Sequence, residues 1–316
     1  MTNNYRSFIC GIKSIKLSKY EINFLKIYKP WGIILFSRNI KTIKQTQNLT
    51  KSIKKLFKNN NYPILIDEEG GRISRLRKFL DSSIFTAKYF GDLFSKDRKK
   101  FDTYFDVYIK QISYLLRLLG ININTVPVLD LRRNNGHNII GDRSYSTKIN
   151  VISKISDICI NKFHNNRIGT VIKHIPGHGL SKVDSHINLP IINKNLSYLL
   201  KNDFKLFKKK SSLFAMTGHL LYSNIDNENT TTHSIKIINI IRKNIGFKNI
   251  IITDDLSMKA LKYSIEENTK KSFKAGCDLA LHCNGNLKEM IKVAKNSPKI
   301  NKFILNKTSQ FIDIIS

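Results

Sequence analysis

Three short segments carry side chains that can do acid–base, nucleophilic or ion-pair chemistry at close spacing. In the first, residues 173–179 are Lys-His-Ile-Pro-Gly-His-Gly and residues 184–186 are Asp-Ser-His. The segment therefore holds three imidazoles (His174, His178 and His186), the ammonium of Lys173 and the carboxylate of Asp184. Imidazole titrates near neutral pH, and glycine allows a loop to bend back over a pocket. The segment therefore predicts a loop after a strand that carries these groups over a pocket.

A metal site is the alternative interpretation of the same histidines. Their spacing matches neither His-Glu-x-x-His nor a Cys/His finger, and loop histidines after a strand more often form hydrogen bonds. The Gly-His-Gly of residues 177–179 lacks the further glycine of a dinucleotide fingerprint and the Gly-Lys-Ser/Thr of a P-loop. We therefore expect no metal and no organic cofactor.

The second segment, residues 250–258, is Ile-Ile-Ile-Thr-Asp-Asp-Leu-Ser-Met. A buried strand here would present two adjacent carboxylates at its end. Such a carboxylate can attack a carbon that carries developing positive charge, as an anomeric carbon does. Aspartate before a helix is also a common cap. We assign the attack to Asp254 and capping or support to Asp255.

The third segment, residues 66–77, is Ile-Asp-Glu-Glu-Gly-Gly-Arg-Ile-Ser-Arg-Leu-Arg. Acids followed by two glycines and spaced arginines can hydrogen-bond several hydroxyl groups and pair with an anion. A structural ion-pair network gathers the same residue types. Taken alone, this segment does not choose between the two.

The elements that must position these groups alternate between short apolar runs and longer helical segments. The runs predict strands at 32–36, 63–66, 121–128, 170–172, 213–216, 250–253 and 279–281. Helical spacing occurs at 44–57, 101–119, 151–165, 196–208 and 235–244. This alternation predicts an α/β fold with a parallel sheet. Periodicity alone does not separate a closed barrel from an open sheet.

The placement of polar residues favours the barrel. Polar groups follow almost every predicted strand: residues 67–69, Asp130, Lys173 with His174, His219, and Asp254 with Asp255. Functional groups from many strand ends are typical of a barrel whose active site lies on its C-terminal face, whereas an open sheet concentrates them near one switch point. We predict a single (β/α) TIM-type barrel domain spanning residues 1–316.

The charge of the chain is its most unusual overall property. The 54 basic and 23 acidic residues give a formal net charge of +31. The lysines are spread along the chain without a nucleic-acid-binding signature, so we expect a basic solvated surface and no nucleic-acid partner. Four cysteines without paired spacing indicate no zinc site or disulfide framework. With no signal peptide and no membrane span in the sequence, we expect a cytoplasmic protein without a membrane partner.

The chemical segments together resemble a known family. The resemblance rests on Asp-Glu-Glu-Gly-Gly-Arg (67–72), Val-Pro-Val-Leu-Asp-Leu (126–131), Ile-Gly-Asp-Arg-Ser-Tyr (140–145), Lys-His-x-Pro-Gly-His-Gly with Asp-Ser-His, and Thr-Asp-Asp-Leu-Ser-Met (253–258), in that order. This pattern is similar to the bacterial β-N-acetylhexosaminidases of glycoside hydrolase family 3 that act in cell-wall recycling. Residues 31–39 resemble the family's first strand, and residues 275–284 resemble a segment near its end. The resemblance runs from about residue 9 to residue 286.

The resemblance implies a role for each matching residue. Asp254 would be the nucleophile that forms a covalent glycosyl-enzyme, with net retention. His186 would be the general acid/base, and Asp184 would fix its tautomer and support its cationic form. The positions that bind the sugar and its N-acetyl group match Asp67, Arg75, Arg143, Lys173 and His174.

The implied activity is removal of a terminal, non-reducing β-linked N-acetylglucosamine from anhydromuropeptide-like fragments. The partner would be a small carbohydrate or muropeptide, and we expect a monomer. One departure concerns the family's Asp-x-Arg-Pro-Ala-type segment, because Glu228 stands here about where the arginine would fall. We therefore expect recognition of the acidic, extended part of the substrate to be weaker or differently selective. A nearby lysine such as Lys236 is a possible replacement.

Three alternatives remain at this point. The chain could be a family 3 β-glucosidase or β-xylosidase, but those enzymes generally lack the Lys-His-x-Pro-Gly-His-Gly and Asp-Ser-His loop. It could be a phosphorylase, because a histidine in place of a carboxylic acid removes a negative charge from the mouth of the site. It could also be a decayed hydrolase that binds nucleic acid through its basic surface, which the complete set of catalytic groups disfavours.

Overall fold

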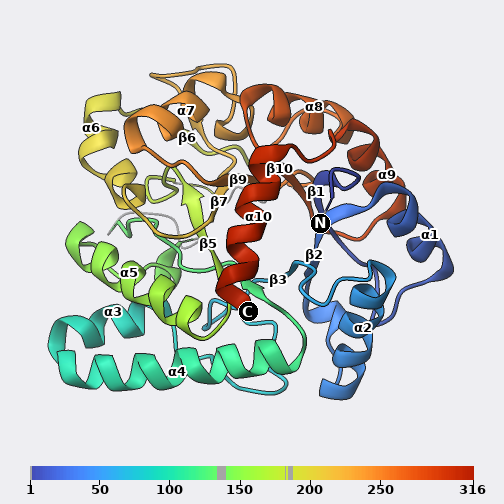
Figure 1. The fold of residues 1–316 in the computed structure, drawn as a ribbon. Helices are drawn as coiled ribbons and strands as arrows, with labels where there is room; N and C mark the ends of the chain where they lie inside the picture. Colours follow the sequence, from blue (N-terminus) through green and yellow to red (C-terminus); the bar gives the residue numbers. More distant parts are fainter. Residues whose placement is uncertain (1, 134–139, 182, 184–187) are drawn as a thin grey trace.

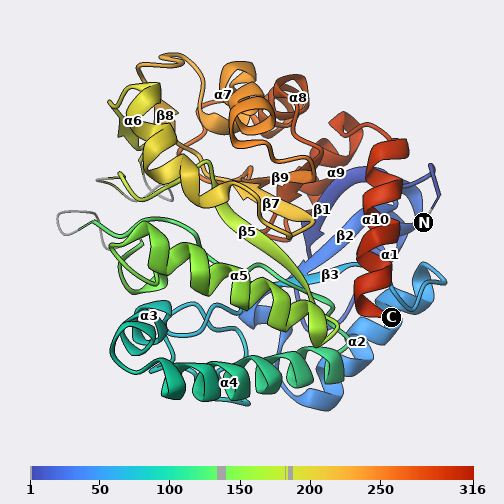
Figure 2. The same cartoon turned by 60° about the vertical axis from the view of Figure 1, so that its left-hand side comes forward.

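Eight parallel strands close into a barrel with the helices around its outside (Figures 1 and 2). The computed structural model describes residues 2–133, 140–181, 183 and 188–316. The barrel strands are β1 (Arg6–Gly11), β2 (Pro30–Leu35), β3 (Ile64–Ile66), β4 (Ile123–Asn124), β5 (Gly169–Ile175), β7 (Phe214–Thr217), β9 (Ile250–Asp255) and β10 (Leu279–His282). They neighbour one another in this order, and β10 pairs with β1 to complete the circle. The predicted α/β barrel is confirmed.

All seven predicted strands are present, but the sequence analysis missed β1. This strand pairs with β2 on one side, where Cys10 lies opposite Ile33, and with β10 on the other, where Phe8 lies opposite Ala280. The segment at Trp31 is therefore the second strand of the barrel, not the first. The apolar run of β1 is short, and its pairing with a strand some 270 residues away gives no local signal.

The α-helices that the structure describes are α1 (Lys19–Tyr28), α2 (Ile43–Leu56), α3 (Ala87–Lys96), α4 (Arg98–Leu118), α5 (Ile149–Asn165), α6 (Leu196–Lys201), α7 (Ile235–Ile240), α8 (Ile265–Ala275), α9 (Leu287–Asn296) and α10 (Lys302–Ile315). Among these described helices, all except α5 begin at a residue whose side chain accepts from a backbone N–H of the first turn. Ser18 and Glu21 form a capping box at α1, which satisfies amide groups that the helix leaves unpaired. Within the described residues, no helix is both long and apolar enough to cross a membrane.

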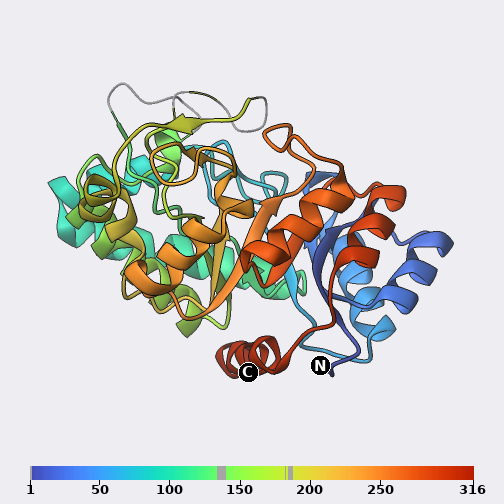
Figure 3. The same ribbon diagram turned by 90° about the horizontal axis from the view of Figure 1, so that it is seen from above.

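One end of the barrel is closed by α10. The indole Nε1 of Trp31 donates to Thr308 Oγ1 at 2.8 Å, and the rings of Phe214 and Phe311 lie 5.7 Å apart. Trp31 and Phe214 stand at the beginnings of β2 and β7, so α10 covers the N-terminal ends of the strands. Figure 3 shows α10 at the bottom, away from the loops that follow the strands. The polar residues that follow the strands lie at the other, C-terminal end of the barrel.

The closure by α10 makes Phe311 a test of the fold. Its side chain is fully buried, so Phe311→Ala should lower the free energy of unfolding by about 3–5 kcal/mol through lost burial and a cavity. Tyr114→Ala, at a side chain that is 59% exposed, should change it by less than about 0.5 kcal/mol. Urea unfolding measures both. Equal midpoints for the two variants would show that α10 does not close the barrel.

Candidate active site

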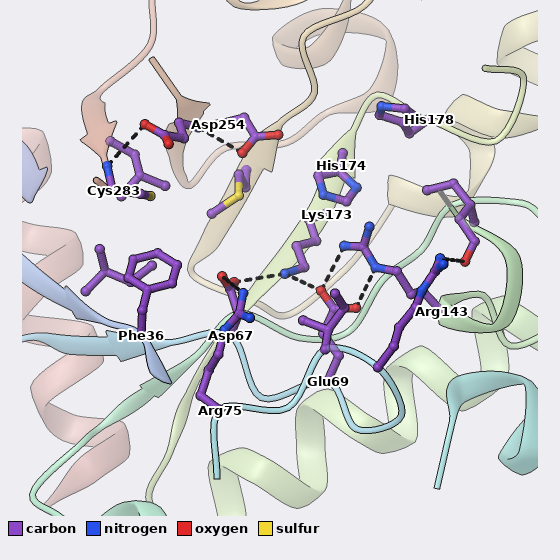
Figure 4. Close-up of a pocket in the computed structure, with 17 residues that line it drawn as sticks. Phe36, Asp67, Glu69, Arg75, Arg143, Lys173, His174, His178, Asp254 and Cys283 are labelled. Atoms are coloured by element: carbon purple, nitrogen blue, oxygen red, sulfur yellow. Dashed lines mark hydrogen bonds and ion pairs between the residues drawn. The ribbon is translucent and has the colours of Figure 1, made fainter. Parts of the chain in front are cut away.

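A pocket of about 320 Å³ lies where the strands end, and it is lined by side chains within or just after six of them (Figure 4). Its walls include Phe36, Asp67, Glu69, Arg75, Arg143, Lys173, His174, His178, Met216, Asp254 and Cys283. Contributions from many strand ends are typical of the active face of a (β/α) barrel. The pocket therefore coincides with the polar strand ends that the sequence analysis singled out.

The buried ammonium of Lys173 is the centre of the charged side of the pocket. Its Nζ lies 3.1 Å from Asp67 Oδ1, 2.6 Å from Glu69 Oε1 and 2.9 Å from Thr125 Oγ1. The side chain is only 3% exposed. Burial by itself would lower the pKa of Lys173, but the charges of Asp67 and Glu69 raise it. Lys173 is therefore held as a cation.

Two arginines complete this network. Arg143 pairs with Glu69 through two hydrogen bonds, Nε to Oε2 at 2.8 Å and Nη2 to Oε1 at 2.9 Å, and Arg75 lies 3.4 Å from Asp67 Oδ2. Burial opposes ionisation of both acids. Nevertheless, Arg143 and Lys173 lower the pKa of Glu69 to about 2, and Lys173 and Arg75 hold the pKa of Asp67 below its usual value. Both carboxylates are ionised at neutral pH.

The side chains of the three consecutive acids after β3 point in different directions and have different partners. Asp67 and Glu69 face the pocket, whereas Glu68 is buried and accepts from the backbone N–H groups of Arg75 at 2.7 Å and Leu76 at 2.9 Å. This is the two-residue alternation of an extended chain. Glu68 thereby holds the loop that brings Arg75 to the site.

Asp130 anchors the segment that follows β5. Its Oδ2 accepts from His174 Nδ1 at 2.7 Å, and its Oδ1 accepts from the backbone N–H of His178 at 2.6 Å. Burial disfavours the charge of Asp130, but the adjacent His174 lowers its pKa. A Cβ at Gly179 would lie 2.1 Å from the carbonyl oxygen of Leu131, so glycine allows this close approach. The bond to Asp130 orients the His174 ring in the pocket wall.

Burial sets the state of His178. Its pKa is lowered to about 4, first by burial and then by the neighbouring His174, whose ring centroid lies 5.5 Å away. His178 is therefore neutral at physiological pH and contributes a polar but uncharged wall.

The paired aspartates at the end of β9 differ in their surroundings. Asp255 is held by Ser257, whose N–H and Oγ donate at 3.1 and 2.8 Å, and by the N–H of Cys283 at 3.1 Å. Asp254 lines the pocket, and its Oδ1 accepts from the N–H of Asp255 at 2.8 Å. In Figure 4, Asp254 projects from β9 on the opposite side of the pocket from the network of Asp67 and Lys173. Asp255 therefore supports the local turn, and Asp254 faces the space a substrate would fill.

The pocket thus brings together six of the residues proposed from the sequence: Asp67, Arg75, Arg143, Lys173, His174 and Asp254. The other two, Asp184 and His186, lie outside the described residues, so their roles remain predictions. Among residues 2–133, 140–181, 183 and 188–316, no group of three or more His, Cys, Asp or Glu side chains could hold a metal ion. Because His186 belonged to the metal hypothesis, the expectation of no metal stays a prediction.

Several pocket residues had no role in the sequence analysis. Glu69 was noted only as one of several acids, although alternation from Asp67 could have assigned it to the pocket. Phe36, Met216 and Cys283 are apolar or weakly polar, so nothing in the sequence distinguished them from core residues. The guanidinium carbons of Arg38 and Arg75 lie 4.8 and 5.4 Å from the centroid of the Phe36 ring. Phe36 therefore packs against Arg75, the arginine that contacts Asp67, through a cation–π contact.

The segment that departs from the family pattern lies away from this pocket. Asp226 accepts from the N–H groups of Glu228 and Asn229 at 3.1 and 3.0 Å and from Ser234 Oγ at 2.7 Å. Glu228 and Lys236 line a separate cavity of about 370 Å³. Neither is among the described residues that line the pocket of Asp254.

The barrel and its pocket define an enzyme whose polar active face can bind a hydroxyl-rich substrate opposite a carboxylate. The model of the glycosyl hydrolase family 3 N-terminal domain matches residues 9–310. A β-hexosaminidase of Neisseria meningitidis is 31% identical over 285 residues, which cover 87% of this chain and 77% of that protein. A β-hexosaminidase of Haemophilus influenzae is 29% identical over 307 residues, with 92% and 85% covered.

A solved structure shows the same fold. The crystal structure of NagZ from Neisseria gonorrhoeae in complex with zinc ion superposes with a TM-score of 0.84 at 27% identity, covering 98% of this chain and 90% of that one. The chain belongs to glycoside hydrolase family 3, among the bacterial β-N-acetylhexosaminidases. It is a glycoside hydrolase, as the motifs predicted.

The network around Glu69 predicts a pH dependence of stability. The pKa of Glu69 is depressed from 4.5 to about 2 in the folded protein. A depressed pKa contributes stability that is present above pH 4.5 and is lost as the pH falls toward 2. Glu69→Gln should therefore be less stable than wild type at pH 6, and the gap should narrow by pH 3. Urea unfolding at both pH values measures this difference in the free energy of unfolding. The same difference at pH 6 and pH 3 would mean that the charge of Glu69 does not contribute to stability.

Proposed function

We propose that this protein removes terminal, non-reducing β-linked N-acetylglucosamine by a retaining mechanism, acting on anhydromuropeptide-like peptidoglycan fragments in the cytoplasm. The observation that carries the proposal is the position of Asp254. Its carboxylate lines the pocket opposite the charged network of Asp67, Lys173, Glu69 and Arg143. Membership of the family and the names of the related β-hexosaminidases support the choice of sugar.

In the first step, Asp254 attacks the anomeric carbon as the bond to the leaving oxygen breaks. The transition state resembles an oxocarbenium ion, and a carboxylate beside it stabilises the developing positive charge. We assign protonation of the leaving oxygen to His186, supported by Asp184. The electron pair of the broken bond stays on the leaving oxygen, and the sugar remains as an ester on Asp254.

In the second step, the neutral imidazole of His186 takes a proton from water, and the water oxygen attacks the anomeric carbon. The ester bond to Asp254 breaks, and its electron pair returns to the carboxylate. Two inversions at one carbon give net retention. Histidine suits both steps because its unperturbed pKa of about 6.5 lies close to neutral pH.

The charged side of the pocket would bind the sugar. Asp67 presents carboxylate oxygens to hydroxyl groups, while Lys173, Arg75, Arg143 and His174 present donors to hydroxyl or carbonyl oxygens. Most of these charges are already paired and buried, so they need little rearrangement when a substrate arrives. Binding would therefore use a site whose polar groups are set in advance.

The acceptor in the second step is water in this proposal, with phosphate as the alternative. Appearance of N-acetylglucosamine 1-phosphate in phosphate buffer would identify a phosphorylase, and free sugar as the sole product would identify a hydrolase. We propose that residues 1–316 act as one barrel domain and as a monomer. With Glu228 outside the pocket lining, contacts to the distal part of the aglycone would differ from those of relatives that carry arginine.

Replacement of Asp254 tests the nucleophile. Wild type should release nitrophenol from 4-nitrophenyl β-N-acetylglucosaminide in phosphate-free buffer, faster than from the β-glucoside, and Asp254→Asn should lose at least about 10³-fold in kcat because no carboxylate can attack. Sodium azide should restore turnover in Asp254→Gly and give the α-glycosyl azide, since azide then attacks from the vacated face.

Asp92→Asn, at an exposed acid on α3, is the matched control and should keep full activity. An active Asp254→Asn enzyme would contradict the assignment. Faster cleavage of the β-glucoside would support the rival glucosidase activity.

Replacement of His186 tests the acid/base. In His186→Ala, kcat/KM should fall by about 10²–10⁴-fold for a substrate with a sugar leaving group, because that oxygen needs a proton. It should fall much less for 4-nitrophenyl β-N-acetylglucosaminide, whose phenolate leaves unprotonated. Asp184→Asn should also lower kcat/KM for both substrates. Equal losses on the two substrates would argue against the acid role.

A further inference from the structure

A continuous set of hydrogen bonds joins the end of β7 to the backbone around Asp254. The N–H of Asp254 donates to Thr217 Oγ1 at 3.3 Å, and Thr217 Oγ1 lies 2.9 Å from Thr232 Oγ1. Thr232 Oγ1 in turn lies 2.8 Å from Nδ1 of His219, and Nε2 of His219 lies 2.9 Å from the carbonyl oxygen of Asp255. Thr217, His219 and Thr232 are fully buried. The chain of bonds therefore begins and ends on the two aspartates.

The groups at the two ends of this chain of bonds determine which atom donates the proton in each hydrogen bond. The carbonyl of Asp255 can only accept, so Nε2 of His219 carries a proton; in a neutral ring Nδ1 then accepts from Thr232. Thr232 has used its proton, so the hydroxyl of Thr217 donates to Thr232 and accepts from the N–H of Asp254. One arrangement satisfies all four bonds. A protonated His219 would take the Thr232 oxygen as its acceptor and leave the Thr217 proton without a partner in the chain.

The surroundings keep this arrangement in place. Burial lowers the pKa of His219, which favours the neutral ring. The short helical turn η4 (Thr231–His233), which carries Thr232, is tied to the barrel: Thr231 N–H donates to Leu220 O at 2.7 Å, and Cys277 Sγ donates to Thr232 O at 3.6 Å. β7 and β9 are neighbouring strands, with Met216 opposite Ile252. The bonds thus run between segments that are themselves hydrogen-bonded to their neighbours.

We propose that His219 is a positioning residue for glycoside cleavage: with Thr217 and Thr232 it fixes the backbone on both sides of the Asp254 carboxylate and so sets its angle of attack. The proposal rests on the proposed function, because it takes Asp254 as the nucleophile. The physical reason is that displacement of a reacting group by about 1 Å can cost about 10²-fold in rate. The N–H of Asp254 and the carbonyl of Asp255 bracket the residue whose side chain must meet the anomeric carbon.

The test compares rate, affinity and stability in single variants. Thr217→Val removes the acceptor of the Asp254 N–H at nearly constant side-chain volume. It should lower kcat about tenfold, the effect expected for loss of one hydrogen bond, and should change KM by less than about twofold. Thr217→Ser should restore most of the rate. Thr217→Val/Thr232→Val should lose no more than Thr217→Val alone, because both residues act through one chain of bonds.

Two replacements of His219 separate its two contacts. In His219→Asn the amide oxygen can take the place of Nδ1 and accept from Thr232, but no donor reaches Asp255. In His219→Gln the amide nitrogen can reach Asp255, but the bond to Thr232 is lost. Each should lower kcat for 4-nitrophenyl β-N-acetylglucosaminide by about tenfold. His219→Phe removes both contacts and should lose about 10²-fold or more.

Thr308→Val is the matched control. Thr308 is a buried threonine that accepts from Trp31 at the other end of the barrel, so its loss should lower the melting temperature without changing kcat. Unchanged kcat in Thr217→Val and both polar His219 variants, in an enzyme that Asp254→Asn inactivates, would overturn the positioning role and leave the proposed function intact. An inactive wild type would overturn the proposed function, and the positioning role with it.

Discussion

The buried ammonium of Lys173 is the constraint on which the rest of the site depends. A cation that is 3% exposed is tolerated only when nearby charges and hydrogen bonds replace its hydration. Asp67 and Glu69 supply those charges from the end of β3, and Thr125 supplies a hydroxyl. The two acids are themselves largely removed from water, and Arg75 and Arg143 supply further counter-charges. The charged wall of the pocket is therefore one coupled network rather than a set of separate contacts.

This network needs a scaffold that brings distant segments to one place. β3 and β5 are separated by one strand, so Lys173 on β5 reaches the acids after β3 across the barrel mouth. The opposite end of the barrel is filled by α10 through Trp31, Phe214 and Phe311. The two ends of the barrel therefore differ. Apolar packing stabilises the N-terminal end, and the charged residues of the pocket lie at the C-terminal end.

Within the site, the charged wall and Asp254, the proposed nucleophile, are held in different ways. The wall is fixed by ion pairs between side chains, whose strength comes from burial. The backbone around Asp254 forms hydrogen bonds with Thr217 and His219, and the neighbouring Asp255 carboxylate accepts from the N–H groups of Ser257 and Cys283. The bonds through Thr217 and His219 reach the backbone around Asp254, so they act on the position of the proposed nucleophile.

The sequence alone determined the class of fold, the family and the residue types of the site. Alternating strands and helices predicted the barrel, polar strand ends predicted its active face, and the motifs around Lys173 and Asp254 indicated the chemistry, because these signals are local. The tertiary structure decided the pairings: that β1 closes the barrel, that Glu69 rather than Glu68 faces Lys173 and Arg143, and that Asp130 orients His174. It also separated Glu228 and Lys236 from the pocket and joined His219 to Asp255. Such contacts depend on strand order and register between segments far apart in the chain, and a local pattern carries no information on either.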